Sequence, residues 1–464
     1  MIFARSAACL TAALLFCGAA IAQEPDKSAA ESVERNLNNL NQVEDLKAAA
    51  AGAPIPFEAV LAAPENVKLN LAYARQRIEA GDLKEAASAL DRVLLIDPNL
   101  AGARVIYGLV LFRMQMYDRA RYELEKALEG ELSAQARAEA NRYLDKIKRL
   151  QKRTRGSITL TAGVEYDSNR NESPSSGNVL FRLFNTQFIL PGEPRNGDAA
   201  YITSVQARMT HDLGMQNGAT LFGEADYYRS DKIEVDKLDL DAVTVAGGVT
   251  WNWGDLTITP EAHAAYLYLE HDNYLKSFGG QLELLLHLRP DLRTYLVLRG
   301  DDEIYMPVPD FQADINRNGR RLTARAGVNW NINQEMQFTV EGLAEDKNAA
   351  KPFEAFNRYG AYAQHVWLHG RGAFTLVGLW AQHSGYDGPD PFVTLRTRSD
   401  WLYRARVSAG APISWFLPHL QAPNAVKDIN IIAQYEYERV DSNILNYDYH
   451  AHKVELLLSK RFSF

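Results

Sequence analysis

The chain ends with the stretch His450-Ala-His-Lys-Val-Glu-Leu-Leu-Leu-Ser-Lys-Arg-Phe-Ser-Phe464. Apolar and polar side chains alternate in it: Val454 and Leu456 fall on one side of a period-two pattern, Glu455 and Ser459 on the other. A β-strand points successive side chains to opposite faces, so the pattern predicts a strand with one apolar and one polar face. An edge strand of a soluble sheet would show the same alternation, and the rest of the chain is needed to assign the fold.

The alternation continues backward through the chain as far as Gly156. Leu322 and Ala324, for example, alternate with Thr323 and Arg325. We expect about fourteen antiparallel strands, an even number, as in single-chain bacterial outer-membrane barrels. The expected strands are 157–166, 201–212, 219–229, 241–253, 255–269, 275–288, 292–300, 321–331, 335–345, 358–368, 372–383, 400–415, 428–439 and 450–464.

Long and short connections alternate between these strands. Short turns are expected at 214–218, Gly254, 290–291, Asn333 and 370–372, and longer polar loops between them. This asymmetry is typical of outer-membrane barrels, which have short periplasmic turns and long outer loops. The connections near 271–274 and 416–427 break the alternation. The expected long loops are 167–200, 230–240, 301–320, 346–357, 384–399 and 440–449, and the first of these is our candidate to fold into the lumen.

The faces of the strands can be assigned from the cost of placing charge in lipid. An Arg or Lys facing lipid at mid-bilayer costs about 2–4 kcal/mol, so charged strand residues should face the lumen. The terminal Phe462 and Phe464 resemble the C-terminal signal of outer-membrane barrels, whose assembly machinery reads a terminal aromatic residue. A soluble β-sandwich is the competing fold, and it does not predict alternating loop lengths. The residues that we expect to face the lumen include Arg208, Glu224, Arg293, Arg325, Arg404, Arg406 and Glu436.

A helical repeat precedes the strands, within residues 65–155. Tyr73 and Leu90 recur 34 residues later as Tyr107 and Leu124. This period, with small residues at the helix crossings, resembles the tetratricopeptide repeat. Such repeats usually bind a peptide or a protein on their concave face, and a purely structural spacer is the alternative. The expected client-binding residues of the concave face are Tyr73, Arg77, Arg104 and Tyr107.

The N-terminal residues 1–22 resemble a secretory signal peptide. Arg5 provides the positive start and Ala20-Ile21-Ala22 the cleavage site, so we expect cutting before Gln23 and then a flexible leader over 23–64. Both cysteines of the chain lie within this signal, so we expect no thiol and no disulfide in the exported protein. No uncharged apolar run of a length that could span a bilayer follows, and we expect no transmembrane helix.

Composition and motifs also bear on the chemistry. The net charge of −8 and the absence of basic runs with interleaved aromatic residues argue against a nucleic-acid partner. The chain has no catalytic serine elbow, zinc-protease motif or phosphate loop. His450 and His452 share a strand face, but two ligands are a weak metal signal. We therefore expect no enzymatic activity, no cofactor and no metal.

The first expected strand ends in the motif Gly163-Val-Glu-Tyr-Asp-Ser-Asn-Arg-Asn171. Asp and Asn favour turns, so a structural loop cap is one adequate explanation. The pattern also resembles the surface lipoprotein assembly modulator family, in which such a motif opens a barrel after a tetratricopeptide segment. Arg170 departs from it, because a small apolar residue is expected there. The motif residues are Gly163, Tyr166, Asp167, Asn169 and Asn171.

The resemblance spans most of the chain and has consequences for function. It implies a translocon that moves a client protein, either a surface lipoprotein or a secreted protein, from the periplasm to the cell surface. An exopolysaccharide secretion porin, a passive channel with a helical docking domain and an outer-membrane lipase are the alternatives. Exopolysaccharide secretion porins share this architecture but usually carry many more helical repeats.

The sequence thus predicts an α+β multidomain protein of a Gram-negative outer membrane. Tetratricopeptide-like helices precede a transmembrane antiparallel β-barrel of about fourteen strands. The expected domains are the signal peptide (1–22), the leader (23–64), a periplasmic helical domain (65–155) and the barrel (156–464). The expected partners are the client protein, outer-membrane lipid and the barrel assembly machinery, with no nucleic acid, and the protein is expected to be a monomer.

Overall fold

The computed structural model describes residues 55–150, 152–184, 186–215, 218–309, 312–417, 426 and 428–464. The chain divides into two compact units between Lys152 and Arg153, slightly before the expected boundary at 155/156. The first unit is helical and the second contains the strands. The expected signal peptide, 1–22, and most of the leader, 23–64, lie outside the described residues.

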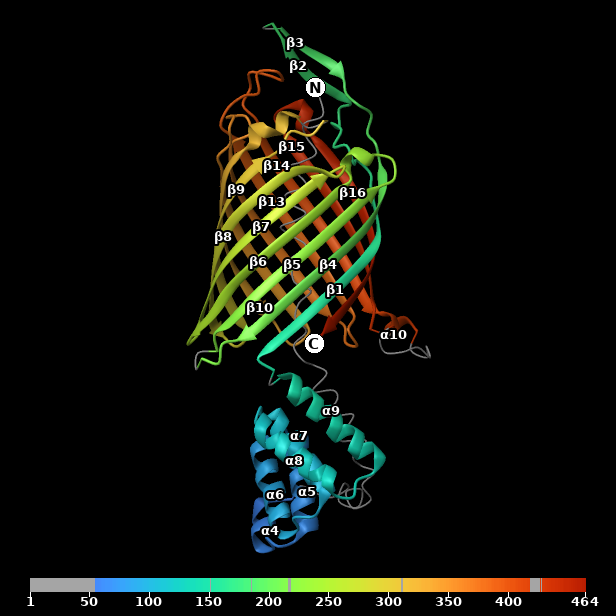
Figure 1. Cartoon of the computed structure of the whole chain (residues 1–464), viewed down its shortest axis with the longest axis vertical. Helices are drawn as coiled ribbons and strands as arrows, with labels where there is room; N and C mark the ends of the chain where they lie inside the picture. The colour runs from blue at the N-terminus through green and yellow to red at the C-terminus, as the bar shows by residue number, and fades with distance from the viewer. Residues whose placement is uncertain are drawn as a thin grey trace. The chain divides into compact units, whose positions relative to one another are not determined.

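The helical unit consists of two helix pairs, with one helix before them and one after. Asn66 begins the first pair, because its side chain accepts a hydrogen bond of 3.1 Å from the Leu69 N–H group and caps the helix. None of the described helices is long and apolar enough to cross a membrane. The helices are α4 (Phe57–Ala62), α5 (Val67–Glu79), α6 (Leu83–Ile96), α7 (Ala101–Arg113), α8 (Tyr117–Glu129) and α9 (Ala134–Leu150) (Figure 1).

Small residues at the crossings let the helices of each pair pack closely. A Cβ atom at Gly108 of α7 would lie 2.6 Å from Cγ of Leu124 in α8, so no larger residue fits there without a shift. Leu90 and Leu124, which are equivalent positions of the repeat, are both buried. Tyr143 and Ile147 of α9 are buried in the same core, so α9 packs against the second helix pair. The expected helical repeat is therefore confirmed, and α9 closes it at its C-terminal end.

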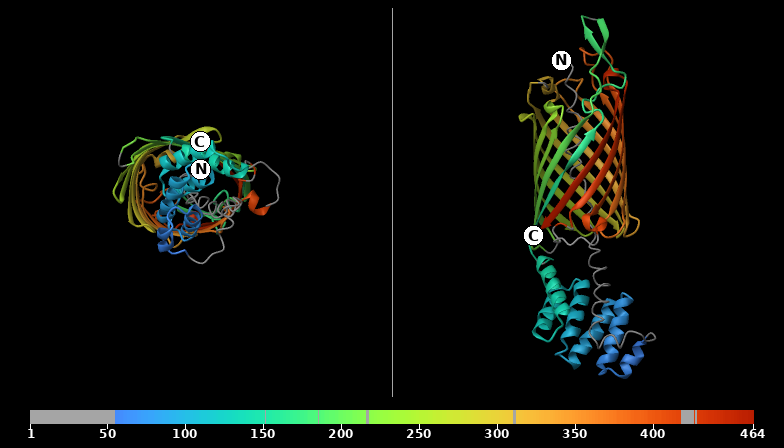
Figure 2. Two further views of the ribbon diagram at one scale, coloured as in Figure 1. Left: turned by 90° about the horizontal axis from the view of Figure 1, so that it is seen from below. Right: turned by 90° about the vertical axis from the view of Figure 1, so that its right-hand side faces the viewer.

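The second unit is a closed antiparallel barrel of fourteen strands, which the view from below shows as a ring (Figure 2). Each strand pairs with its neighbours in the chain, and β1 closes the ring by pairing with β16. The strands are β1 (Thr154–Asp167), β4 (Asp198–Asp212), β5 (Thr220–Lys232), β6 (Leu240–Trp253), β7 (Leu256–Leu269), β8 (Asp272–Arg289), β9 (Leu292–Tyr305), β10 (Gly319–Asn331), β11 (Met336–Lys347), β12 (Phe356–Leu368), β13 (Phe374–Tyr386), β14 (Ser399–Pro412), β15 (Asn430–Ser442) and β16 (Tyr449–Ser463).

These bounds confirm the expected number and positions of the barrel strands, with small differences at their ends. β14 stops at Pro412, before the expected residue 415, and the short helix α10 (Ile413–Phe416) follows it. Proline has no backbone N–H group to donate to a ladder, which accounts for the earlier end. Several of the short turns contain residues in the left-handed backbone conformation, such as Gly254 with a φ of 61°.

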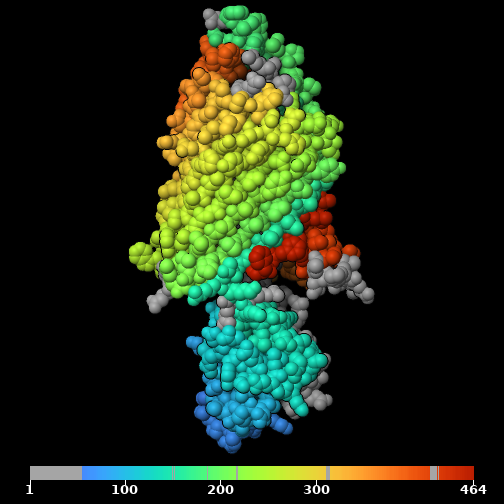
Figure 3. Space-filling view, viewed as in Figure 1, coloured from blue at the N-terminus to red at the C-terminus, as the bar shows by residue number. Residues whose placement is uncertain are grey.

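The loop 167–200 does not fold into the lumen, and our expectation for it was wrong. It forms a hairpin of β2 (Asn178–Leu183) and β3 (Thr186–Pro191), which projects beyond the ends of the barrel strands (Figures 1 and 3). All six residues of β3 are exposed. The two strands of the hairpin pair with each other. A residue from another loop also holds the hairpin, because the Asn446 side chain bonds both the N–H and the C=O group of Leu180, at 2.6 Å and 2.9 Å.

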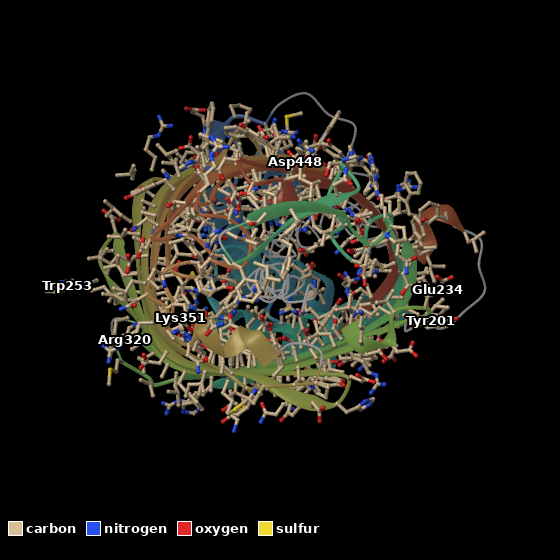
Figure 4. All side chains as sticks on the ribbon, turned by 90° about the horizontal axis from the view of Figure 1, so that it is seen from above. Tyr201, Glu234, Trp253, Arg320, Lys351 and Asp448 are labelled. Carbon is tan, nitrogen blue, oxygen red and sulfur yellow. The ribbon has the colours of Figure 1, made fainter. Side chains whose placement is uncertain are left out.

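A different loop folds inward at the same end of the barrel. The 3₁₀-helix η2 (Gln312–Arg317) joins β9 to β10 and lies just inside the ring, near Lys351 (Figure 4). Asp314 is fully buried and accepts a hydrogen bond of 2.5 Å from the Tyr274 hydroxyl group. Burial raises the pKa of Asp314, an effect that nearby Arg317 opposes. The described part of this loop therefore covers a sector of the mouth.

The close contact at Gly108 gives a test of the helical packing. We expect Gly108→Ala to destabilise the helical unit by about 1–3 kcal/mol, because the added methyl group overlaps Leu124. Thermal unfolding of the full chain, followed by the helical circular-dichroism signal, measures this. Leu95→Ala is the control, since Leu95 of α6 is 76% exposed, and it should leave the transition unchanged. An unshifted transition for Gly108→Ala would contradict the packing.

Candidate functional site: the lumen wall

The barrel strands have one apolar and one polar face. On β14, Trp401 and Val407 are 45% and 46% exposed, whereas the Arg404 side chain on the opposite face is 10% exposed. Viewed from above, the labelled Tyr201 and Trp253 point away from the ring (Figure 4). The apolar face is therefore the outside of the barrel and the polar face the inside. We call the inward-facing side chains of the fourteen strands the lumen wall.

A first group of paired charges in the lumen wall crosses β9 to β12. Arg321 lies 2.8 Å from Glu303 and 3.1 Å from Glu345. Lys347 binds Glu303 at 2.9 Å, and Arg358 binds Glu345 at 3.1 Å. The five side chains form a chain of alternating sign across four strands. Since four of the five residues are buried, each charge depends on its partners for compensation.

A second group crosses β14 to β16. Arg404 pairs with both Glu436, at 3.3 Å, and Glu438. Arg406 lies 2.5 Å from Glu436. The hydroxyl group of Tyr449 donates to Glu438 at 2.9 Å. Three of the expected lumen residues, Arg404, Arg406 and Glu436, are therefore brought together in one network.

The other expected lumen residues are placed separately. Arg208 of β4 and Glu224 of β5 form an ion pair of 2.7 Å. Arg325 lies 3.8 Å from Glu341, a pair at the limit of direct contact. Arg293 lies near the start of β9, outside these networks.

The sequence alone did not lead us to the first network. Arg321 and Arg325 are four residues apart on β10, and Glu341 and Glu345 are four apart on β11, so each pair shares a face. That even spacing was the available signal, since Arg325 is among the residues expected to face the lumen. The partners depend on strand register, which the sequence does not specify.

The two histidines that we considered for metal binding are engaged with other side chains. The ring of His450 contacts Arg195 at 3.0 Å and Ser175 at 3.2 Å. His452 bonds the Tyr435 hydroxyl group at 2.8 Å. Within the described part of the chain, no three His, Cys, Asp or Glu residues are grouped so that they could hold a metal ion.

The motif that begins at Gly163 lies at the junction of β1 and β16. Gly163 is paired with Leu457, and a Cβ atom added to it would lie 2.2 Å from the carbonyl oxygen of Leu456. Tyr166 is 51% exposed on the outer face. Asp167 ends the strand, where its side chain accepts a hydrogen bond of 2.9 Å from the Asn169 N–H group. The start of the motif therefore fits β1 closely against β16.

The two asparagines of the motif connect this junction to the β2–β3 hairpin. The Asn169 amide donates to the carbonyl groups of Ser173, at 3.0 Å, and His450, at 3.2 Å. Asn171 bonds the backbone at Pro194, at 2.9 Å, on the far side of the hairpin. Arg170, the residue that departs from the family pattern, has a nearly buried side chain 2.5 Å from Glu165. These contacts give the motif a structural role at the β1–β16 seam, the junction where these two strands pair, at its end nearest the β2–β3 hairpin.

The helical residues that we expected to bind a client are largely used inside the helical unit. Tyr73 and Tyr107 are each 3% exposed and belong to its core, so the expectation for these two is corrected. Burial and a hydrogen bond to Glu85 raise the pKa of Tyr73. Arg77 and Arg104 form ion pairs at 3.3 Å and 2.5 Å. A unit with two repeats needs the large rings for its own core.

Comparisons with known proteins give no family assignment. No family model and no curated protein matches the chain. Among solved structures, OpdQ of Pseudomonas aeruginosa is 11% identical and covers 68% of this chain and 100% of its own, with a TM-score of 0.33. OccD1 (OprD) is 10% identical over 67% of this chain and 96% of its own, with a TM-score of 0.33. The first TPR domain of human RPAP3 is 22% identical over 20% of this chain and 70% of its own, with a TM-score of 0.18.

Substitution at Gly163 tests the close fit of the seam. We expect Gly163→Val to prevent β1 from closing on β16, because its side chain would overlap the β16 backbone. Folded barrel is measured by heat-modifiable mobility on a denaturing gel. Gly223→Val is the matched control, since a Cβ atom at Gly223 meets nothing within 4 Å, and it should fold normally. Equal folding of the two variants would contradict the proposed fit.

Proposed function

We propose that this protein is an outer-membrane translocon that delivers a client protein, a surface lipoprotein or a secreted protein, from the periplasm to the cell surface. The barrel provides the passage and the helical unit receives the client. The proposed mechanism consists of binding and conduction, with no covalent step.

The observation that carries the proposal is the division of the barrel into an apolar exterior and a charged lumen wall. Within a bilayer, outward side chains such as Trp401 and Val407 suit lipid, and inward ion pairs such as Arg404–Glu436 suit water. A ring of this number of strands is wider than side chains on the wall can fill. The arrangement supports a polar passage across the outer membrane.

The pairing of the charges favours a polypeptide cargo over an acidic polysaccharide. A conduit for a polymer with one sign of charge is expected to carry an excess of the other sign on its wall. Here cations and anions alternate, as in the series Lys347, Glu303, Arg321 and Glu345. Such a wall neither attracts nor repels one sign strongly. It suits a chain that carries both signs, which an unfolded protein does.

The order of the chain supports a periplasmic position for the helical unit. α9 ends at Leu150 and β1 begins at Thr154, so the helices connect directly to the first residue of the barrel. Thr154 and the C-terminus belong to the end of the barrel with short turns, which in outer-membrane barrels faces the periplasm. A receptor for a periplasmic client is needed on that side.

Single cysteines test this topology, because residues 23–464 contain none. We expect Phe184→Cys, at a hairpin position that is 93% exposed, to react with a membrane-impermeant maleimide on intact cells. Leu95→Cys, at a position of α6 that is 76% exposed, should react only after the outer membrane is permeabilised. Labelling of both variants in intact cells, or of neither, would contradict the orientation.

Surface delivery is tested by protease shaving of cells that carry the full chain, no chain, or a chain without residues 65–152. We expect one exported protein to leave the surface and accumulate in the periplasm in the last two strains. The alternatives predict other results. Loss of surface polysaccharide with normal protein display supports an exporter, and unchanged ion conductance without the helices supports a passive channel.

A further inference from the structure

Two aromatic side chains form a stacked pair in the lumen wall, on β12 and β13. Tyr362 and Trp380 are cross-strand neighbours, and their ring centroids are 4.6 Å apart at an interplanar angle of 24°. Both residues are half-buried, so part of each remains accessible. We call this pair the aromatic platform. Neither the sequence motifs nor the ion-pair networks account for it.

A glycine makes room for the platform on the wall. A Cβ atom at Gly378 would lie 2.7 Å from Cη2 of Trp380 and 3.5 Å from Cε2 of Tyr362. The indole ring therefore occupies the space that a side chain at Gly378 would fill. Glycines in strands commonly mark such close approach.

The charged groups beside the platform already have partners in the wall. The Arg406 guanidinium group lies 5.3 Å from the Trp380 ring centroid and 2.5 Å from Glu436. On the other side, Glu341 accepts a hydrogen bond of 2.7 Å from the Tyr295 hydroxyl group. A ligand at the platform therefore meets the accessible parts of two aromatic rings, flanked by charges that are largely neutralised.

We propose that the aromatic platform binds an extended polypeptide in the lumen by stacking with its aromatic and arginine side chains and its peptide planes. Aromatic and cation–π stacking require no polar partners on the wall and tolerate varied sequences. A sugar ring also stacks, but its hydroxyl groups require several placed donors and acceptors, and the nearby Arg406 and Glu341 already pair with other side chains. The inference depends on the proposed function for its cargo, but binding can be measured independently of delivery.

The chain provides a matched control for this pair on the neighbouring strand. Trp401 and Tyr403 of β14 also stack, with centroids 5.9 Å apart at 7°, and both are 45% exposed on the outer face. Replacing either pair removes the same two ring types from the barrel. A polypeptide in the lumen contacts the first pair and cannot reach the second.

The test uses the full chain in lipid nanodiscs and a dye-labelled, unstructured polypeptide rich in tyrosine and arginine. Binding is measured by fluorescence anisotropy for the wild type, Tyr362→Leu/Trp380→Leu and Trp401→Leu/Tyr403→Leu. We expect the inner double substitution to weaken binding at least about fivefold and the outer one to leave it unchanged. Trp380→Phe retains a ring and introduces no bulk, so it should weaken binding less than the inner double substitution. This variant replaces the inner double variant in the binding test if the latter folds poorly.

Competition with maltoheptaose distinguishes the two ligand classes. If it displaces the polypeptide from the wild type but not from the inner double variant, the platform binds carbohydrate and the proposal is overturned. Equal polypeptide affinity for wild type and inner variant also overturns it. Failure of the proposed function is seen separately, as unchanged client display in protease shaving.

Discussion

Within lipid, every backbone N–H and C=O group of a strand must be hydrogen-bonded, since no water is available to replace a missing partner. Pairing of β1 with β16 meets this requirement, because it leaves the barrel without an edge. The fit at Gly163 and the bond from Asn169 to His450 lie at this same junction. Two residues of the motif that resembles a family pattern therefore contribute to ring closure.

Closure also determines the chemistry of the two faces. Once the strands are paired around a ring, alternate side chains must point to lipid or to the lumen. Lipid accepts apolar groups, so charge is confined to the wall, where it is stabilised by partners of opposite sign. The networks around Arg321 and Arg404 are the result, and each links side chains from at least two strands. The glycine below Trp380 adds space at the wall that charge does not fill.

Local patterns predicted most of the fold, and long-range register accounts for what they missed. The strand around Leu322 and Ala324 and the helices around Leu90 and Leu124 follow from periodicity and burial. The direction of the loop 167–200 depends on Asn446, which is more than two hundred residues away. Pairing of Glu303 with Arg321 requires the register of β9 with β10. Tyr73 was assigned to a binding face because a short repeat unit offers no sequence signal that its ring is needed in the core.

The manner in which the β2–β3 hairpin is attached has a consequence for its tolerance of change. It belongs to its own two-stranded sheet and not to the barrel ladder, and side chains such as Asn446 and Asn171 hold it at fixed points. A change in the length or sequence of its tip, near Phe184, alters no barrel register and removes none of these bonds. The tip of the hairpin can thus vary in length and sequence while the barrel beneath it stays the same.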